Sequence, residues 1–261
     1  MTGAGAVVTL VLLEWTVGWL GAAAWTQTWS VVKRGHFRIV AWCVIATGLL
    51  TALAGRQDDF EGSGSLRTVT VTLVCMSIVY LLVQYSNTDL PGAVVGAAAA
   101  VVGVIALTLS GASLGDWPVM LASAQLISGA LLLGAVTNGM LLGHWYLNQP
   151  GLKPWALSRL TTLTLVATGI SGILGLVAVA RLSSATTEGA VLGIPGFGES
   201  FGVPFYLIWL TLLGFTGLVA LAARRCIKLR SIQSATGLYY VAILTAGVSE
   251  FLVRYLMVNS A

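Results

Sequence analysis

Eight long uncharged runs constrain the fold of this chain more than any other feature. The 261 residues are 57% apolar and only 8% charged, whereas soluble domains carry about a quarter charged residues. Runs of about 20 apolar residues are long enough to cross a bilayer as helices. They do not alternate as the roughly ten-residue strands of membrane barrels do. The pattern therefore predicts an all-α integral membrane protein, a bundle of eight transmembrane helices.

We expect one polytopic domain over residues 1–261. Segments rich in Gly, Ser or Pro separate the apolar runs, as is typical of turns between helices. The connection 182–201 is expected to be a solvated linker, with a docking surface or lid as the alternative. The first run is interpreted as a retained span, because no Lys or Arg precedes Lys33 to form the basic segment of a signal peptide. The predicted spans are 5–29, 38–54, 67–85, 92–110, 118–146, 160–181, 202–223 and 235–257.

The distribution of basic residues predicts the orientation of the bundle. Connections after the first, fifth and seventh spans hold nine of the thirteen Lys and Arg, whereas those after the second and sixth hold three. Because connections rich in Lys and Arg stay in the cytoplasm, we expect both termini outside a bacterial-type inner (plasma) membrane. The net charge of +4 does not indicate nucleic-acid binding, since the basic residues lie in short connections.

Three ionisable side chains lie inside predicted spans, away from the headgroup ends: Glu14 in the first, and Glu250 and Arg254 in the last. Each costs about 2.5–3.5 kcal/mol at the centre of a membrane helix. At about 1.5 Å per residue, Glu14 lies ~10 Å below the outer boundary, and Glu250 lies at nearly the same depth. Glu250 and Arg254 share a helix face through their i,i+4 spacing. We therefore expect this pair to interact, and the first and last spans to be neighbours.

The same three residues have three interpretations, two functional and one structural. One is an outer-leaflet proton or quinol site, and another is a transport site, because ionisable residues within spans often mark proton and substrate pathways. The third is structural, with a Glu250–Arg254 pair and a Glu14 that is hydrogen-bonded or protonated.

The two histidines, His36 and His144, are both expected on the cytoplasmic side. His36 stands in a predicted connection beside Lys33 and Arg34, and His144 closes the fifth span. Axial ligation of a haem needs two histidines that face each other across the ring, so we expect no haem held by this chain. A hydrogen bond from His144 to a quinone headgroup is an alternative role.

We expect His144, Trp145 and Tyr146 to form an interfacial anchor, with Trp29 in the same cytoplasmic belt. The reason is that amphipathic aromatic rings are enriched at the level of the lipid headgroups.

Other residues predict packing inside the bundle. Gln125 and Asn138 are buried amides that are expected to bond to neighbouring helices. Span 92–110 is built almost wholly from small residues, which allow close helix contacts, so we expect it to be buried. The tryptophans that crowd the first two spans are expected to face lipid or a partner, with Trp15 and Trp19 on one helix face; they are Trp15, Trp19, Trp25, Trp29 and Trp42.

The sequence offers little for catalysis by this chain alone. It contains no nucleophile–base pair, no glycine-rich phosphate loop and no cluster with metal-ligand spacing. Cys43, Cys75 and Cys226 form no CxxC motif and are interpreted as inert thiols. We expect no metal site and no covalently bound cofactor, and we expect quinone or lipid as the classes of ligand.

The last span, QSATGLYYVAILTAGVSEFLVRYLM (233–257), has a Glu four residues before an Arg-Tyr pair. It resembles the polytopic membrane-anchor subunits of molybdopterin oxidoreductases, of the dimethyl sulfoxide reductase type, and the eight-span layout with both ends outside is similar to theirs. The resemblance covers this span and the topology, about a tenth of the chain. It implies a subunit that anchors an iron–sulfur and catalytic pair and exchanges electrons with menaquinol, commonly without haem.

The expected function is therefore a non-catalytic integral-membrane subunit of a respiratory or photosynthetic electron-transfer complex. Such a subunit anchors partner subunits, contacts membrane lipids and contributes to a quinone site. The alternatives are a small-solute or ion transporter that uses Glu14, Glu250 and Arg254, and a structural or assembly protein that binds lipids.

The predicted orientation is open to a direct test with topology reporters. Reporter fusions at Lys153 and at Arg225 should both give cytoplasmic signals, because each lies in a connection rich in basic residues. An outside signal at either position contradicts the orientation.

Overall fold

The computed structural model describes residues 3–57, 63–86, 88–146, 148–149, 151–185 and 201–260. Within these ranges every regular element is a helix. The eight long helices are α1 (Gly3–Gln27), α2 (Arg34–Ala54), α3 (Ser63–Val83), α4 (Leu90–Ala112), α5 (Val119–Trp145), α6 (Trp155–Val177), α8 (Gly202–Lys228) and α9 (Ile232–Asn259). The short elements are a 3-10 turn, η1 (Gly55–Gln57), and the helix α7 (Val179–Ser183).

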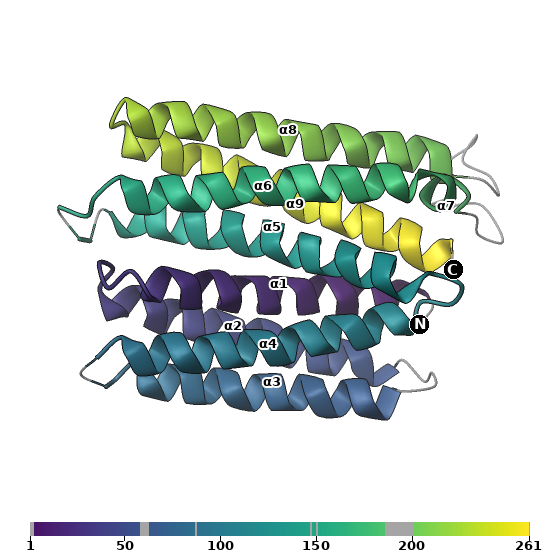
Figure 1. Cartoon of the computed structure of the whole chain (residues 1–261), viewed down its shortest axis with the longest axis horizontal. Coiled ribbons are helices and arrows are strands. Elements are labelled where there is room, and N and C mark those ends of the chain that lie inside the picture. The colour runs from purple at the N-terminus through teal and green to yellow at the C-terminus, as the bar shows by residue number, and fades with distance from the viewer. Residues whose placement is uncertain are drawn as a thin grey trace.

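The eight long helices are all long and apolar enough to cross a membrane, which confirms the predicted all-helical fold with eight candidate spans. Each overlaps one predicted span, and no end differs by more than five residues. Residues 186–200 of the expected linker 182–201 lie outside the described residues. The helices run side by side along the long axis, and the start of α1 and the end of α9 lie at the same end of the bundle (Figure 1).

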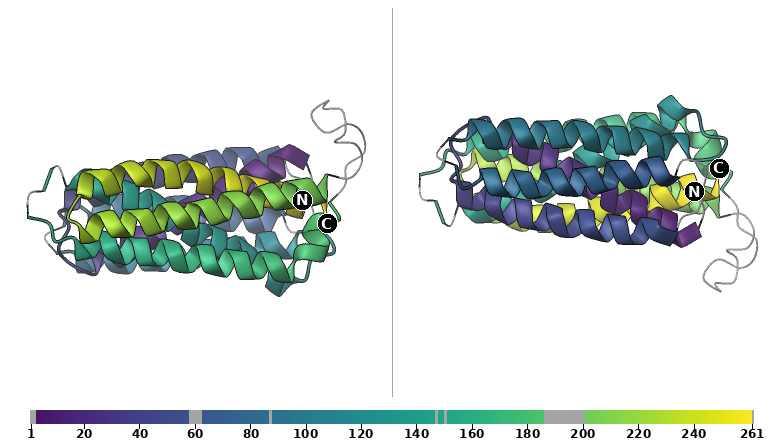
Figure 2. Two further views of the ribbon diagram at one scale, coloured as in Figure 1. Left: turned by 90° about the horizontal axis from the view of Figure 1, so that it is seen from above. Right: turned by 90° about the horizontal axis from the view of Figure 1, so that it is seen from below.

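The long helices form two groups of four with the same order of neighbours. In the first group α1 contacts α2, α2 contacts α3, α3 contacts α4, and α4 returns to α1. In the second group α5, α6, α8 and α9 repeat this closed order. The two groups lie side by side, with α1 and α5 adjacent where they meet (Figure 1, Figure 2). The bundle therefore has two similar halves, although the sequence has no evident internal repeat.

The helices that join the two halves, α1 and α5, are the most enclosed. In their most apolar 18-residue windows, 78% of α1 and 67% of α5 are buried, against 39% for α4. The expected burial of span 92–110 therefore holds for one face only. Val17 of α1 covers Gly103 of α4, whereas Val101 on the same helix is exposed. Small residues permit close packing, but they do not determine which helix lies at the centre.

The expectation that the tryptophans of the first two spans face lipid or a partner is wrong for Trp19, which is buried. Trp15 is half-buried against α5, whereas Trp25 and Trp42 are exposed as expected. Trp19 is only 8% exposed. The indole N–H of Trp15 donates a hydrogen bond to Thr137 Oγ1 on α5 at 2.8 Å. Both residues belong to α1, which α2, α4, α5 and α9 surround.

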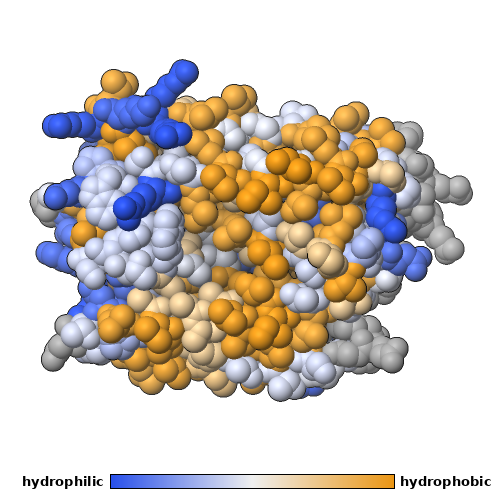
Figure 3. Space-filling model, in the orientation of Figure 1, coloured by the Kyte–Doolittle hydropathy of each residue, from blue (hydrophilic) through white to orange (hydrophobic). Residues whose placement is uncertain are grey.

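The exterior of the bundle is the kind of surface that a bilayer requires. A band of hydrophobic side chains lies between hydrophilic side chains at the two ends of the view in Figure 3. Ile173 on α6, Leu218 on α8 and Leu244 on α9 are each more than 60% exposed. Contiguous apolar surface of this kind is unfavourable in water and suits contact with lipid.

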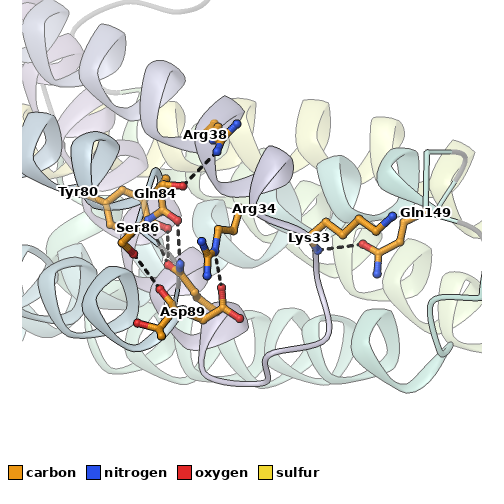
Figure 4. Close-up of polar contacts among 10 residues, drawn as sticks. Lys33, Arg34, Arg38, Tyr80, Gln84, Ser86, Asp89 and Gln149 are labelled. Carbon is orange, nitrogen blue, oxygen red and sulfur yellow. Dashed lines mark hydrogen bonds and ion pairs between the residues drawn. The ribbon is translucent and has the colours of Figure 1, made fainter.

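Polar contacts close the end of the bundle where α2 begins (Figure 4). Arg34 Nε pairs with Asp89 Oδ1 at 3.2 Å, and the backbone N–H of Lys33 donates to Gln149 Oε1 at 2.9 Å. These contacts join α2 to the start of α4 and to the α5–α6 connection. The placement of His36 in a connection is therefore wrong, because α2 already begins at Arg34. Polar partners from distant segments allow this basic stretch to be helical.

The two halves meet at a backbone contact between α1 and α5. A Cβ atom added at Gly18 would overlap the carbonyl oxygen of Ala130, and one added at Gly134 would overlap the carbonyl oxygen of Gly18. Only glycine permits this separation, and close approach of backbones is a main source of helix association in membranes.

Gly18→Ala should destabilise the protein by about 1–3 kcal/mol, because the added methyl group pushes α1 away from α5. Gly21→Ala on the same helix is the matched control, since its Cβ would make only an ordinary contact with Ala100 at 3.6 Å. The measurement is thermal unfolding in detergent. Equal melting temperatures for the two variants would show that the contact has no special role.

Candidate functional site

The three ionisable residues predicted within the spans meet inside the bundle. Arg254 Nε lies 2.6 Å from Glu14 Oε1, and Arg254 Nη2 lies 2.7 Å from Glu250 Oε2. All three side chains are at most 1% exposed. The contacts confirm the predicted Glu250–Arg254 pair and the predicted contact between the first and last spans. We call these three residues the ion cluster.

Helix α5 forms a third wall of the ion cluster. Arg254 Nη2 also donates to the backbone carbonyl of Gln125 at 2.9 Å. A Cβ atom added at Gly129 would overlap both the Arg254 guanidinium and the Glu250 carboxylate. Gly129 therefore provides the space that the charges occupy. Sequence reasoning missed this residue, because nothing distinguishes it among the 31 glycines of the chain.

The ion cluster contains two carboxylates for one guanidinium. If both carboxylates were ionised, the cluster would hold an excess negative charge, and burial of such a charge is strongly unfavourable. One bound proton makes it neutral. Glu14 Oε2 and Glu250 Oε1 accept no hydrogen bond from the described residues. The arrangement therefore has both the charge and the free oxygen atoms that are needed to take up one proton.

A second buried polar network lies nearer the other end of α1. His36 Nε2 is 3.1 Å from Asn138 Oδ1, and Asn138 Nδ2 donates to Thr26 Oγ1 at 2.8 Å and to the carbonyl of Ala22 at 3.3 Å. His36 is fully buried. Since the Asn138 Nδ2 group donates elsewhere and its oxygen is the acceptor here, the imidazole donates through Nε2. The predicted bonding of Asn138 to neighbouring helices is thus confirmed.

The residues expected to anchor the protein at the interface mainly connect its own segments. The Trp145 indole donates to Gln149 Oε1 at 3.1 Å, and the Tyr146 hydroxyl donates to the carbonyl of Lys153 at 2.7 Å. His144 is exposed and takes no part in the His36 network. Both hydrogen bonds join α5 to the α5–α6 connection, so these two aromatic residues fasten that end of the bundle.

Metal-binding and thiol chemistry gain no support from the described residues. No group of three or more His, Cys, Asp or Glu that could hold a metal ion occurs among them. Cys43, Cys75 and Cys226 are free.

Comparison with protein-family models, with curated proteins and with solved structures finds no match for this chain. The assignment of the site therefore rests on the ion cluster itself.

Arg254→Ala should damage folding more than the triple change Arg254→Ala, Glu14→Gln and Glu250→Gln. The single change leaves two adjacent buried carboxylates without a cation, and breaking a buried pair typically costs about 3–5 kcal/mol. Arg224→Ala, which removes an exposed guanidinium from α8, is the control. The yield and melting temperature of the purified variants show which of them is destabilised more. A triple variant no better than the single one would mean that packing, and not charge, dominates.

Proposed function

We propose that the chain is a non-catalytic integral-membrane subunit of an electron-transfer complex, in which the ion cluster takes up a proton during quinol-linked turnover. The observation that supports this proposal is the pair of buried carboxylates, Glu14 and Glu250, that share the single guanidinium of Arg254. In the orientation with both termini outside a bacterial plasma membrane, this cluster lies in the outer half of the bilayer.

The chemistry of quinol oxidation fits such a cluster. Oxidation of a quinol releases protons, and a base held near the quinol accelerates the step. Glu14 is the better candidate for this base. Glu250 Oε2 accepts a hydrogen bond from Arg254 Nη2, whereas neither carboxyl oxygen of Glu14 accepts a hydrogen bond from the described residues. Glu250 and Arg254 also belong to the span that resembles the membrane anchors of molybdopterin oxidoreductases.

The enclosure of the ion cluster favours proton uptake over solute transport. A transported solute needs a polar space around the charges, whereas the side chains of Glu14, Glu250 and Arg254 are at most 1% exposed. A proton needs no such space, because it moves between hydrogen-bonded groups and occasional water molecules. Membrane lipids and the other subunits of the complex are the proposed partners.

Glu14→Gln should leave the complex assembled and reduce quinol-linked turnover by roughly 100-fold or more, the effect expected when a general base is removed. Turnover with an artificial donor that bypasses quinol should not change. His144→Gln is the matched control, because His144 is exposed at the opposite end of the bundle and belongs to a competing quinone assignment.

Purification with gentle detergent supplies the first arm of this test. A redox-active partner and a bound quinone should copurify with the chain. Isolation without any redox partner, together with solute-dependent uptake by the purified protein in liposomes, would contradict the proposal and support a transporter.

A further inference from the structure

An apolar groove lies between α1, α4, α5 and α6, and no residue of the ion cluster lines it. Its volume is ≈ 270 Å³. Small residues from three helices line it, among them Gly21 and Ala22 of α1, Ala100 of α4 and Ala130 of α5. In the view of Figure 1, α4 and α6 lie on either side of α1 and α5. The groove is open to the outside of the bundle, because Leu131, which also lines it, is 39% exposed.

The length and lining of the groove suit a hydrocarbon chain. It follows α1 from Val17 to Trp25, which at 1.5 Å per residue is about 12 Å. One leaflet of a bilayer has a hydrocarbon depth of about 15 Å, half of the full core. Every residue that lines the groove is apolar or aromatic. A quinone ring would find almost no hydrogen-bond partner there.

The groove ends at an aromatic cluster that holds one cation. Trp25, which lines the groove, packs edge-on against Trp29 with ring centroids 4.8 Å apart, and Trp29 packs against Trp155 at 5.4 Å. The guanidinium of Arg159 lies 4.5 Å from the centroid of the Trp155 ring. Arg159 is one helical turn from Leu163, which also lines the groove. The guanidinium of Arg159 therefore lies at the end of the apolar groove.

Arg159 has no carboxylate partner among the described residues. The ion pairs found there join Arg34 to Asp89 and Arg254 to the two buried glutamates. Arg159 is exposed and contacts the faces of Trp29 and Trp155. These contacts hold the guanidinium beside the two rings and use none of its N–H groups, and a planar fork of donors matches the oxygen atoms of a phosphate.

We propose that this groove binds one anionic phospholipid, with an acyl chain between α1, α4, α5 and α6 and the phosphate at Arg159. Tryptophan rings are enriched at the depth of lipid headgroups, which is where the cluster of Trp25, Trp29 and Trp155 then lies. Anionic lipids are also attracted to basic residues next to the membrane. The site is separate from the ion cluster, and it does not depend on the function proposed for that cluster.

The test uses the full chain reconstituted in bilayers of equal parts phosphatidylglycerol and phosphatidylcholine. Native mass spectrometry after gentle solubilisation measures which lipid the protein retains. The wild-type protein should retain phosphatidylglycerol in preference. Arg159→Gln should reduce the ratio of the two retained lipids roughly five-fold, and Arg159→Lys should restore part of it. Arg67→Gln, which removes an exposed charge at the start of α3 outside the groove, should leave the ratio unchanged.

A second variant tests the groove itself. Gly21→Leu places a side chain in the groove and should reduce retention of both lipids. The melting temperature of this variant shows whether the protein is folded. An unchanged ratio in Arg159→Gln would overturn the proposal. So would retention of a quinone, in place of a phospholipid, that Gly21→Leu displaces.

Discussion

The contact between the backbones of α1 and α5 determines the rest of the structure. Gly18 packs directly on Ala130 and Gly134, and this close approach joins two four-helix halves. Glu14 lies one turn before Gly18 along α1, and Thr26 lies two turns after it. Two buried polar groups of the bundle, the ion cluster and the His36 network, therefore form where α1 meets α5. A wider separation of these helices would loosen both.

Stability alone does not account for the ion cluster. Apolar side chains of similar volume are often as stabilising as a buried ion pair, because charges lose their hydration when they are buried. The cluster instead fixes the position of α9 along α1. Arg254 can contact both Glu14 and the Gln125 carbonyl at only one axial position of α9. Positioning of α9 requires one carboxylate beside Arg254, whereas the cluster contains two. For this reason our proposal gives the cluster a role in proton uptake in addition to its role in architecture.

The sequence predicted those features that depend on the membrane as a solvent. Apolar length located all eight helices, and the cost of charge in lipid singled out Glu14, Glu250 and Arg254 before any contact was known. Prediction from the sequence failed where the buried face of a helix had to be distinguished from its lipid-exposed face. Both faces are apolar in such a protein, so periodicity is weak. Trp19 and the grouping of the helices into two halves were missed for that reason.

The remaining failures concern partners that are far apart in the chain. His36 stands in a basic stretch that is typical of a connection, yet its hydrogen-bond partner is Asn138 on α5. Gly129 was missed because the need for space there becomes evident only when α9 lies against α5. In both cases the deciding neighbour is supplied by another helix.

The ion cluster also links the first of the eight helices to the last. During synthesis Glu14 reaches the membrane with α1, whereas Arg254 arrives only after the other long helices have been made. Until then the carboxyl group of Glu14 has no cation beside it, and the side of α1 and α5 that α9 covers stays open. Synthesis of α9 and closure of the core are therefore the same event. A protein truncated before α9 keeps an unmatched acid in its centre, a defect that distinguishes it from the finished molecule.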